Sequence, residues 1–190
     1  MHWPDSHPLL TPLGPWFESH RRDMPWRDGD LARPHPNPYA VLVSEIMLQQ
    51  TQVATVIPYF ERWMERFPDA TSLSLASDEE IHKFWEGLGY YRRARHLHES
   101  VKHIAAQGWP SNFEGLLKLP GLGPYTAAAV ASIAFQWPEP ALDGNAFRVL
   151  ARLLGIEGDP KLRAKQLRSW LRPGQVLPAT ISFPVPEALH

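Results

Sequence analysis

The chain has 190 residues, of which 44% are hydrophobic, and a formal net charge of −1 at pH 7. This length predicts one domain or two small ones, with enough apolar residues to build a core. The sequence contains no cysteine, which excludes disulfides, thiolate metal ligands and a thiol nucleophile. No apolar stretch is long enough to span a bilayer, and the first fifteen residues do not resemble a signal peptide. A cytoplasmic location is therefore expected.

The predicted elements are all helices, because apolar residues recur at helical spacing and no convincing period-2 strand is present. A first helix at 8–22 contains Trp16 and Phe17, and a loop rich in Pro, Gly and Asp follows it. Asn37-Pro38 then marks a helix start. Further helical segments are predicted downstream, with a candidate break before Gln52: 38–67, 72–76, 81–86, 92–107, 113–118, 126–135, 144–154 and 160–172.

These elements predict an all-α chain in three parts. Residues 1–37 form an N-terminal helix and the loop that leads away from it, and residues 38–172 form a helical domain. Residues 173–190 contain four prolines and lack helical periodicity. This composition predicts an irregular tail.

A glycine hairpin between two helices is predicted at Leu119-Pro-Gly-Leu-Gly-Pro-Tyr-Thr-Ala127. Gly121 and Gly123 suit a tight turn, and Pro124 suits the first position of a helix because its missing N–H has no partner there in any case. Backbone N–H groups at such a helix start can bind phosphate. An ordinary helix–helix turn is the alternative for this stretch taken alone.

Two carboxylates have surroundings that predict different protonation states. Glu45 is the only charged residue in the apolar segment 38–60, so burial should raise its pKa and make it a general acid. Asp143 precedes an amphipathic helix, whose N-terminus would keep it ionised. Partial exposure of Glu45 and simple capping by Asp143 are the alternatives. Together the pair suits acid-assisted cleavage of a glycosidic bond.

The phosphate-binding hairpin lies between these carboxylates in sequence, so the predicted substrate is a nucleic acid. Cleavage at a base would require the nucleotide to be flipped from the stack. Two local basic runs fit a phosphate backbone, although a solvated helix face explains either run alone. Residues 144–172 contain seven Lys or Arg against two acidic residues, and residues 90–98 combine basic with aromatic side chains.

Four motifs in this order resemble the adenine DNA glycosylases of base-excision repair, within the helix–hairpin–helix glycosylase superfamily. They are Ser44–Val53, Gly87–Arg95, Leu119–Ala127 and Leu142–Asn145, and the resemblance runs from about Trp16 to about Trp170. It implies a monomeric enzyme that removes adenine opposite guanine or 8-oxoguanine in double-stranded DNA, near the nucleoid of the cytoplasm and with no membrane partner.

The resemblance also implies catalytic roles. Glu45 would protonate the adenine leaving group and then help to activate water, and Asp143 would stabilise the sugar cation. Tyr125 occupies the position where related endonuclease III-like lyases carry a Schiff-base lysine, so a monofunctional glycosylase is expected. Tyr125 and Asn145 would support the two carboxylates.

The DNA contacts implied by the resemblance lie in four regions. Trp26 and Arg27 would line the adenine pocket, although packing explains Trp26 equally well. Tyr90 would wedge into the duplex where the adenine left. Gln49, Gln50 and Thr51 would lie near the extruded and opposing bases. The hairpin would bind phosphate through backbone at Gly121, Leu122, Gly123 and Tyr125. Arg93 in the basic run and Lys118 before the hairpin are predicted separately as further phosphate contacts.

The chain departs from the family in two ways. Members usually carry a [4Fe-4S] cluster on four cysteines, and this chain has none to ligate it. After about Trp170 the sequence stops resembling the family, which suggests a truncation or frameshift that removes the C-terminal helices and the cluster segment. Exposed apolar surface at Trp16 and Phe17, and hence marginal stability, would follow. A catalytically dead DNA-binding remnant is therefore the competing interpretation.

Overall fold

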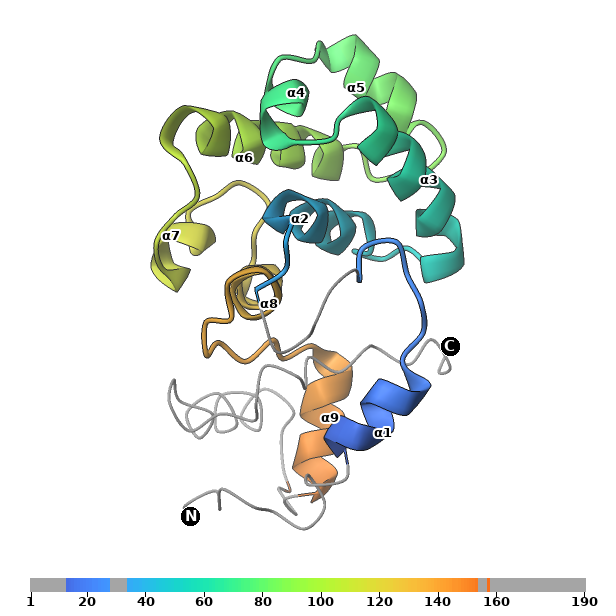
Figure 1. Ribbon diagram of the computed structural model, residues 1–190, viewed down its shortest axis with the longest axis vertical. Coiled ribbons are helices and arrows are strands. Elements are labelled where there is room, and N and C mark those ends of the chain that lie inside the picture. Colours follow the sequence, from blue (N-terminus) through green and yellow to red (C-terminus); the bar gives the residue numbers. More distant parts are fainter. Residues whose placement is uncertain (1–12, 28–33, 154–156, 158–190) are drawn as a thin grey trace.

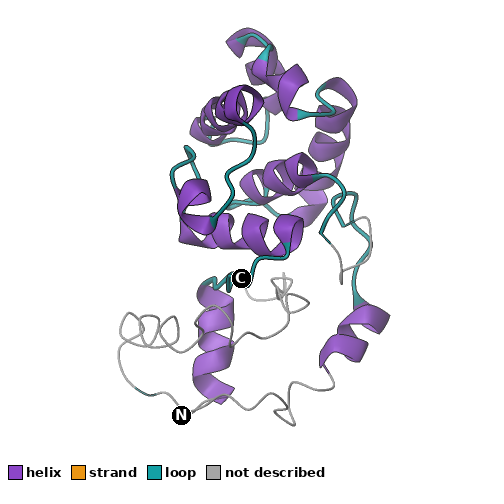
Figure 2. Ribbon diagram, turned by 60° about the vertical axis from the view of Figure 1, so that its left-hand side comes forward, coloured by secondary structure: helices purple, strands orange, loops and turns teal. Residues whose placement is uncertain are grey.

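The computed structural model describes residues 13–27, 34–153 and 157, and these residues form helices and turns without a strand (Figures 1 and 2). The predicted all-α fold is confirmed for this part of the chain. The predicted helix at 160–172 and the predicted irregular tail lie outside the described residues. The helices, in chain order, are α1 (Leu13–His20), α2 (Pro38–Met47), α3 (Val53–Arg66), α4 (Ala70–Ser74), α5 (Asp78–Trp85), α6 (Arg92–Gln107), α7 (Phe113–Leu117), α8 (Pro124–Phe135) and α9 (Gly144–Leu153).

Helix α2 lies at the centre of the fold, between α6 on one side and α8 on the other (Figure 1). Its start follows the predicted capping pattern, because the Asn37 side chain accepts a hydrogen bond from the Ala40 N–H at 3.1 Å and Pro38 occupies the first turn. Nearly every side chain of α2 is buried. The helix ends at Met47, so the expected break is a turn at residues 48–52.

Helices α3 and α6 pack against α2, while α4 packs against α6 and α5 packs against both α3 and α6. This part of the fold buries the largest aromatic side chains. Trp63 and Trp85 are fully buried and meet edge to face, with ring centroids 5.4 Å apart. The indole N–H of Trp63 donates to the Tyr39 hydroxyl at 3.0 Å, which ties α3 to α2. Offset or edge-on aromatic pairs add stability beyond the area they bury. These contacts therefore stabilise the packing of α3 against α2.

The predicted helix–hairpin–helix is present. Helix α7 ends at Leu117, Gly121 adopts a positive φ of 79°, and Gly123 caps α8 with Pro124 at the first helical position. The Ser100 hydroxyl donates to the Pro120 carbonyl at 2.7 Å, so α6 supports the hairpin from behind.

Helices α1 and α9 lie at the other end of the molecule from α4 and α5 (Figures 1 and 2). In α1, Trp16 is 56% exposed and stacks on His20 with a centroid separation of 4.9 Å, while Phe17 is partly exposed. The exposure expected for Trp16 is seen among the described residues, and its consequence for stability stays a prediction. No helix in the described ranges is long and apolar enough to cross a membrane.

Candidate active site

Glu45 lies on the face of α2 that is turned toward Arg27 and Tyr125, as the electrostatic interactions among the three groups indicate. Burial raises the pKa of the Glu45 carboxyl to about 7, and the Arg27 guanidinium opposes that rise. A carboxyl group with this pKa is partly protonated at neutral pH, which is the state a general acid needs. The protonation state predicted for Glu45 therefore agrees with its surroundings.

Arg27 reaches this site from the segment that follows α1. Its backbone N–H donates to the Met24 carbonyl at 2.9 Å, which turns the chain back toward α2. Burial lowers the pKa of the guanidinium, and Arg22 adds to that effect, whereas Glu45 opposes it. One terminal nitrogen, Nη1, is buried without a hydrogen-bond partner among the described residues. An unpaired buried donor costs free energy, so Nη1 is available to a ligand that carries an acceptor.

Trp26, the neighbour of Arg27, has the packing role that the sequence left open. Its ring is 6% exposed and meets Phe60 edge-on at a centroid distance of 5.3 Å. The predicted contact of Trp26 with a base is therefore not supported by its placement. Of this pair, Arg27 is the residue that reaches the site.

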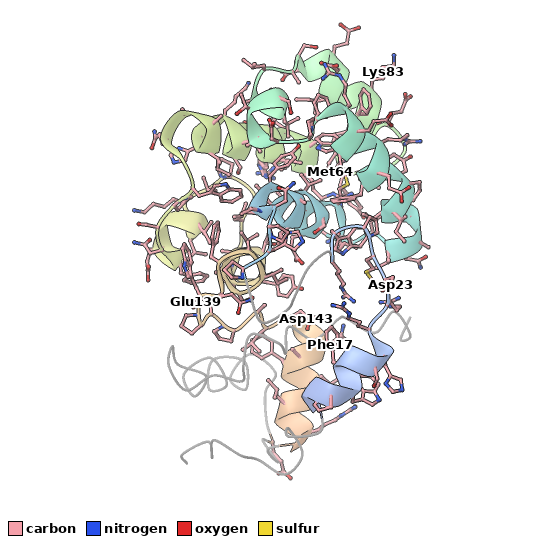
Figure 3. The ribbon with its side chains drawn as sticks, in the orientation of Figure 1. Phe17, Asp23, Met64, Lys83, Glu139 and Asp143 are labelled. Atoms are coloured by element: carbon pink, nitrogen blue, oxygen red, sulfur yellow. The ribbon has the colours of Figure 1, made fainter. Side chains whose placement is uncertain are left out.

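Asp143 caps helix α9, as the sequence predicts, and lies at the end of α9 that faces α8 (Figure 3). Its Oδ1 accepts a hydrogen bond from the Ala146 N–H at 2.7 Å, and its Oδ2 lies 3.3 Å from the amide nitrogen of Asn145. The Asn145 oxygen in turn accepts from Arg148 at 2.9 Å. The Asp143 carboxylate is thus oriented by two donors, and its catalytic role stays a prediction.

Tyr125, at the second position of α8, connects the two carboxylates electrostatically. The Glu45 charge is the largest cause that raises the pKa of the phenol, followed by burial and the Asp143 charge, while Arg27 opposes them. The phenol therefore stays protonated and can donate a hydrogen bond. Tyr125 thus interacts electrostatically with Glu45, Asp143 and Arg27, which come from three other segments of the chain. The common site of these four residues stays a prediction.

The three residues predicted to contact bases, in the turn after α2, differ in side-chain direction and in exposure. The Gln49 side chain donates to the Thr126 hydroxyl of α8 at 3.2 Å, so it is directed inward. The Thr51 hydroxyl lies 3.4 Å from the Gln49 carbonyl. Gln50 is exposed and has a positive φ of 58°. Of the three predicted residues Gln49, Gln50 and Thr51, Gln50 alone is exposed. Thr126 is a supporting residue that the sequence did not reveal.

Arg93 corrects a prediction. The sequence placed it among the phosphate contacts, but its side chain is 8% exposed and its guanidinium donates to backbone carbonyls. A group that is buried and hydrogen-bonded in this way cannot also bind phosphate at the surface. Lys118, at the end of α7, is exposed and stays a candidate phosphate contact.

The hairpin retains part of its predicted phosphate site. The Leu122 N–H donates to the Leu119 carbonyl at 3.2 Å and the Leu122 side chain is 5% exposed, so this residue serves the turn itself. Gly121 and Gly123 are exposed. The first N–H groups of α8 have no intrahelical acceptor, which leaves the Tyr125 N–H available. The anion contacts predicted at Gly121, Gly123 and the Tyr125 N–H stay predictions.

Gly121→Ala is expected to destabilise the fold, whereas Gly123→Ala should leave its stability nearly unchanged. At Gly121 the backbone φ is 79° and an added Cβ would lie 2.7 Å from the His96 Cβ. At Gly123 nothing lies within 4 Å of an added Cβ. A strained, crowded residue costs about 1–3 kcal/mol. Thermal unfolding of the two variants measures the difference, and equal melting temperatures would contradict it.

A metal centre is not formed by the described residues, because no group of three His, Cys, Asp or Glu comes together there. The [4Fe-4S] cluster implied by the resemblance also lacks its thiolates, since the sequence has no cysteine. The residues of this chain do not fit the cluster, and no step of the chemistry below depends on it.

Comparison with known proteins identifies the family. Residues 43–173 match the family described as the HhH-GPD superfamily of base excision DNA repair proteins. The chain belongs to this superfamily. The matched region begins within α2 and includes the hairpin, so it contains both Glu45 and Tyr125. The resemblance drawn from the four motifs is therefore confirmed.

Curated relatives of this HhH-GPD protein are adenine DNA glycosylases. The chain is 41% identical to that of Arabidopsis thaliana over 184 residues, which is 85% of this chain and 29% of the relative. It is 44% identical to the human protein over 164 residues, which is 82% of this chain and 30% of the human protein. It is 41% identical to the protein of Mycolicibacterium smegmatis over 155 residues, which is 80% of this chain and 51% of that relative. The chain thus spans between about a third and a half of these relatives.

Solved structures confirm the helix–hairpin–helix glycosylase fold. A thermostable thymine-DNA glycosylase matches with a TM-score of 0.72 and 27% identity, over 87% of this chain and 77% of that one. A non-covalent endonuclease III–DNA complex matches with a TM-score of 0.66 and 22% identity, over 90% and 76%. The second likeness concerns the fold alone.

Proposed function

We propose that this chain is a monofunctional DNA glycosylase that hydrolyses the N-glycosidic bond of adenine mispaired with guanine or 8-oxoguanine. The observation that carries the proposal is the Glu45 carboxyl, whose pKa is raised to about 7 by burial beside Arg27 and Tyr125. The similarity to adenine DNA glycosylases supports the choice of adenine as the leaving base.

In this mechanism the two carboxylates have different roles. Protonated Glu45 donates its proton to the adenine ring as the bond to the sugar breaks, so that the base leaves neutral. The sugar then carries positive charge, which the ionised Asp143 stabilises from the N-terminus of α9. The Glu45 carboxylate next accepts a proton from the attacking water. An abasic site and free adenine are the products.

Tyr125 separates this reaction from that of a lyase. A Schiff base requires an amine, and the side chain at this position of α8 is a phenol held in its protonated form by the Glu45 charge and by burial. The DNA strand should therefore stay intact after base removal. A hydrogen bond from the phenol to a carboxylate or to the substrate is the role that its position supports.

Single-turnover cleavage of a duplex containing adenine opposite 8-oxoguanine tests the proposal. Strand breaks that form only after alkali treatment indicate abasic sites made without lyase activity. A duplex with adenine opposite thymine provides the substrate control. Breaks that form without alkali would contradict a monofunctional enzyme, and the absence of adenine release would contradict a glycosylase.

A catalytically dead DNA-binding protein is the second candidate. The chain spans 29% to 51% of the curated relatives, and their activity is that of the longer proteins. The two candidates make different predictions for the same duplex. Retention of duplex binding without adenine release at any pH would favour the second candidate.

Lys118→Ala is expected to weaken binding to matched and mismatched duplexes alike. Lys118 is exposed beside the hairpin, so it can neutralise one phosphate. Loss of one such contact should reduce the slope of log affinity against log salt by about 1. Lys83→Ala is the matched control, because Lys83 is exposed on α5, at the far end from α9 (Figure 3). Loss confined to mismatched duplexes would contradict a phosphate contact.

A further inference from the structure

One buried arginine joins two turns that lie far apart in sequence. Arg93 stands in the first turn of α6, and its Nη1 donates to Met47 at 2.8 Å and to neighbouring carbonyls at the end of α2. Its Nη2 donates to the Leu88 carbonyl at 3.1 Å in the turn before α6. The complete set of acceptors is Ile46, Met47 and Gln49 for Nη1, with Leu88 and Gly89 for Nη2.

The planar shape of the guanidinium makes this junction possible. Its two terminal nitrogens point to different sides, so each reaches a different turn. The guanidinium also lies over the Trp85 ring, 5.4 Å from its centroid, and the indole N–H of Trp85 donates to the Gly89 carbonyl at 2.9 Å. The Nε of Arg93 is buried without a partner among the described residues. The side-chain hydrogen bonds of Arg93 among the described residues are therefore all made by its two terminal nitrogens, Nη1 and Nη2.

Each turn presents one exposed side chain on a left-handed backbone. Gln50 has a φ of 58°, and Tyr90 has a φ of 48° with 63% of its surface exposed. Residues other than glycine adopt this conformation only where their surroundings enforce it. Arg93 binds the carbonyl of Gln49 and that of Gly89, which are the peptide groups directly before Gln50 and Tyr90. The Arg93 guanidinium thus holds in place the peptide group that precedes Gln50 and the one that precedes Tyr90.

We propose that Arg93 is a positioning residue that holds the two turns in one fixed relation, so that Gln50 and Tyr90 meet a duplex as a single unit. The proposal rests on the proposed function, in which Gln50 lies near the opposing base and Tyr90 replaces the extruded adenine. A fixed spacing between the Gln50 and Tyr90 side chains lowers the entropic cost of inserting both of them into the duplex at the same base pair. Arg93 itself contacts neither the DNA nor the reacting atoms.

Arg93→Lys tests the junction in the free protein, without reference to DNA. Lysine keeps the charge but has one ammonium group, which cannot bridge the two turns. Hydrogen exchange should become at least about tenfold faster at the N–H groups inside both turns, such as Thr51 and Leu88. Arg95→Lys is the matched control, because Arg95 lies on the same helix with its side chain 66% exposed. Unchanged exchange in either turn would overturn the junction.

A duplex that carries 2-aminopurine in place of the adenine tests whether the fixed turns are needed to flip the base out of the stack. Its fluorescence rises when the base leaves the stack. We expect the affinity of Arg93→Lys for the duplex to stay within about threefold of the wild-type value, because the charge is kept. The variant should lose most of the fluorescence rise. Its single-turnover rate should fall by the same fraction as the fluorescence rise. Arg95→Lys and Glu45→Gln should both retain the rise. A full rise in Arg93→Lys would overturn the proposal.

Two further outcomes separate a structural failure from a functional one. If Arg93→Lys raises exchange in every helix, Arg93 is a general core residue and the proposal is overturned. Whatever the result for Arg93→Lys, Arg93→Ala gives an independent test of the junction. Millimolar guanidinium should restore protection to both turns more than an equal concentration of sodium chloride, and equal effects of the two salts would overturn the junction. If the wild type releases no adenine while the exchange result holds, the proposed function fails and the junction between the turns stands.

Discussion

Glu45→Gln is expected to lower the single-turnover rate of adenine release by about a hundredfold to ten-thousandfold, the range for loss of a general acid. Glutamine keeps the size of the side chain but cannot give up a proton. In the wild type, the pKa of Glu45 is raised to about 7, and the protonated form is the active one. The rate should therefore be constant well below pH 7 and fall about tenfold per pH unit above it. A pH profile of both proteins, with duplex held at saturation, measures this.

Unfolding of Glu45→Gln cannot explain such a loss, because the substitution should stabilise the fold at alkaline pH. The folded carboxyl binds a proton more tightly than the ordinary carboxyl of the unfolded chain. Wild-type stability should accordingly fall as the pH rises from about 4.5 to about 7 and stay lower above that. The variant lacks this dependence, so it should be the more stable protein at pH 8 and nearly equal at pH 4. A rate that rises through pH 7, or a variant less stable at pH 8, would contradict the assignment.

Local signals explain why so much of the fold could be predicted from sequence. The start of α2 depends on Asn37 and Pro38, and the end of α6 depends on Gly108, whose φ is 79°. Each of these residues acts within one turn of its own position, so its effect is independent of the rest of the fold. Glu45 was found in the same way, since a single charge within an apolar helix is visible in the sequence itself.

As a linear stretch, the basic run at residues 90–98 does not indicate which of its arginines is buried. On α6, Arg93 lies on the same face as Leu97, Val101 and Ile104, all of which are buried, whereas Arg92 and Arg95 are exposed. Helical spacing could therefore have placed Arg93 inward. Its acceptors on α2 could not have been predicted, because contacts between distant segments depend on how the helices pack.

Local sequence signals also do not predict that Arg27, Tyr125 and Asp143 lie near one another. Tyr125 and Asp143 belong to different helices, and Arg27 belongs to a segment before α2. Their order along the chain indicates nothing about their proximity. The resemblance to a family supplied that expectation, and the electrostatic interactions of Tyr125 with Glu45, Asp143 and Arg27 now support it physically.

Asp143→Asn is expected to lower the rate of adenine release by about a hundredfold to a thousandfold, the range for loss of one transition-state electrostatic interaction. Its effect on folding should be small. Asparagine caps helices about as well as aspartate, and its side-chain oxygen can still accept the Ala146 N–H that Asp143 now accepts at 2.7 Å. The substitution therefore removes the negative charge while it keeps the cap. Single-turnover kinetics and thermal unfolding of the same sample measure the two effects.

Asp143→Ala separates the two roles further. Alanine removes both charge and cap, so this variant should show a similar loss of rate and, in addition, a loss of about 1 kcal/mol in the free energy of unfolding. If Asp143 stabilises a sugar cation, the rates of the two variants agree while their stabilities differ. If Asp143 only caps α9, the rate instead follows stability, and Asp143→Asn releases adenine nearly as fast as the wild type. The rate of the Asp143→Asn variant therefore decides whether the Asp143 carboxylate stabilises the sugar cation or only caps α9.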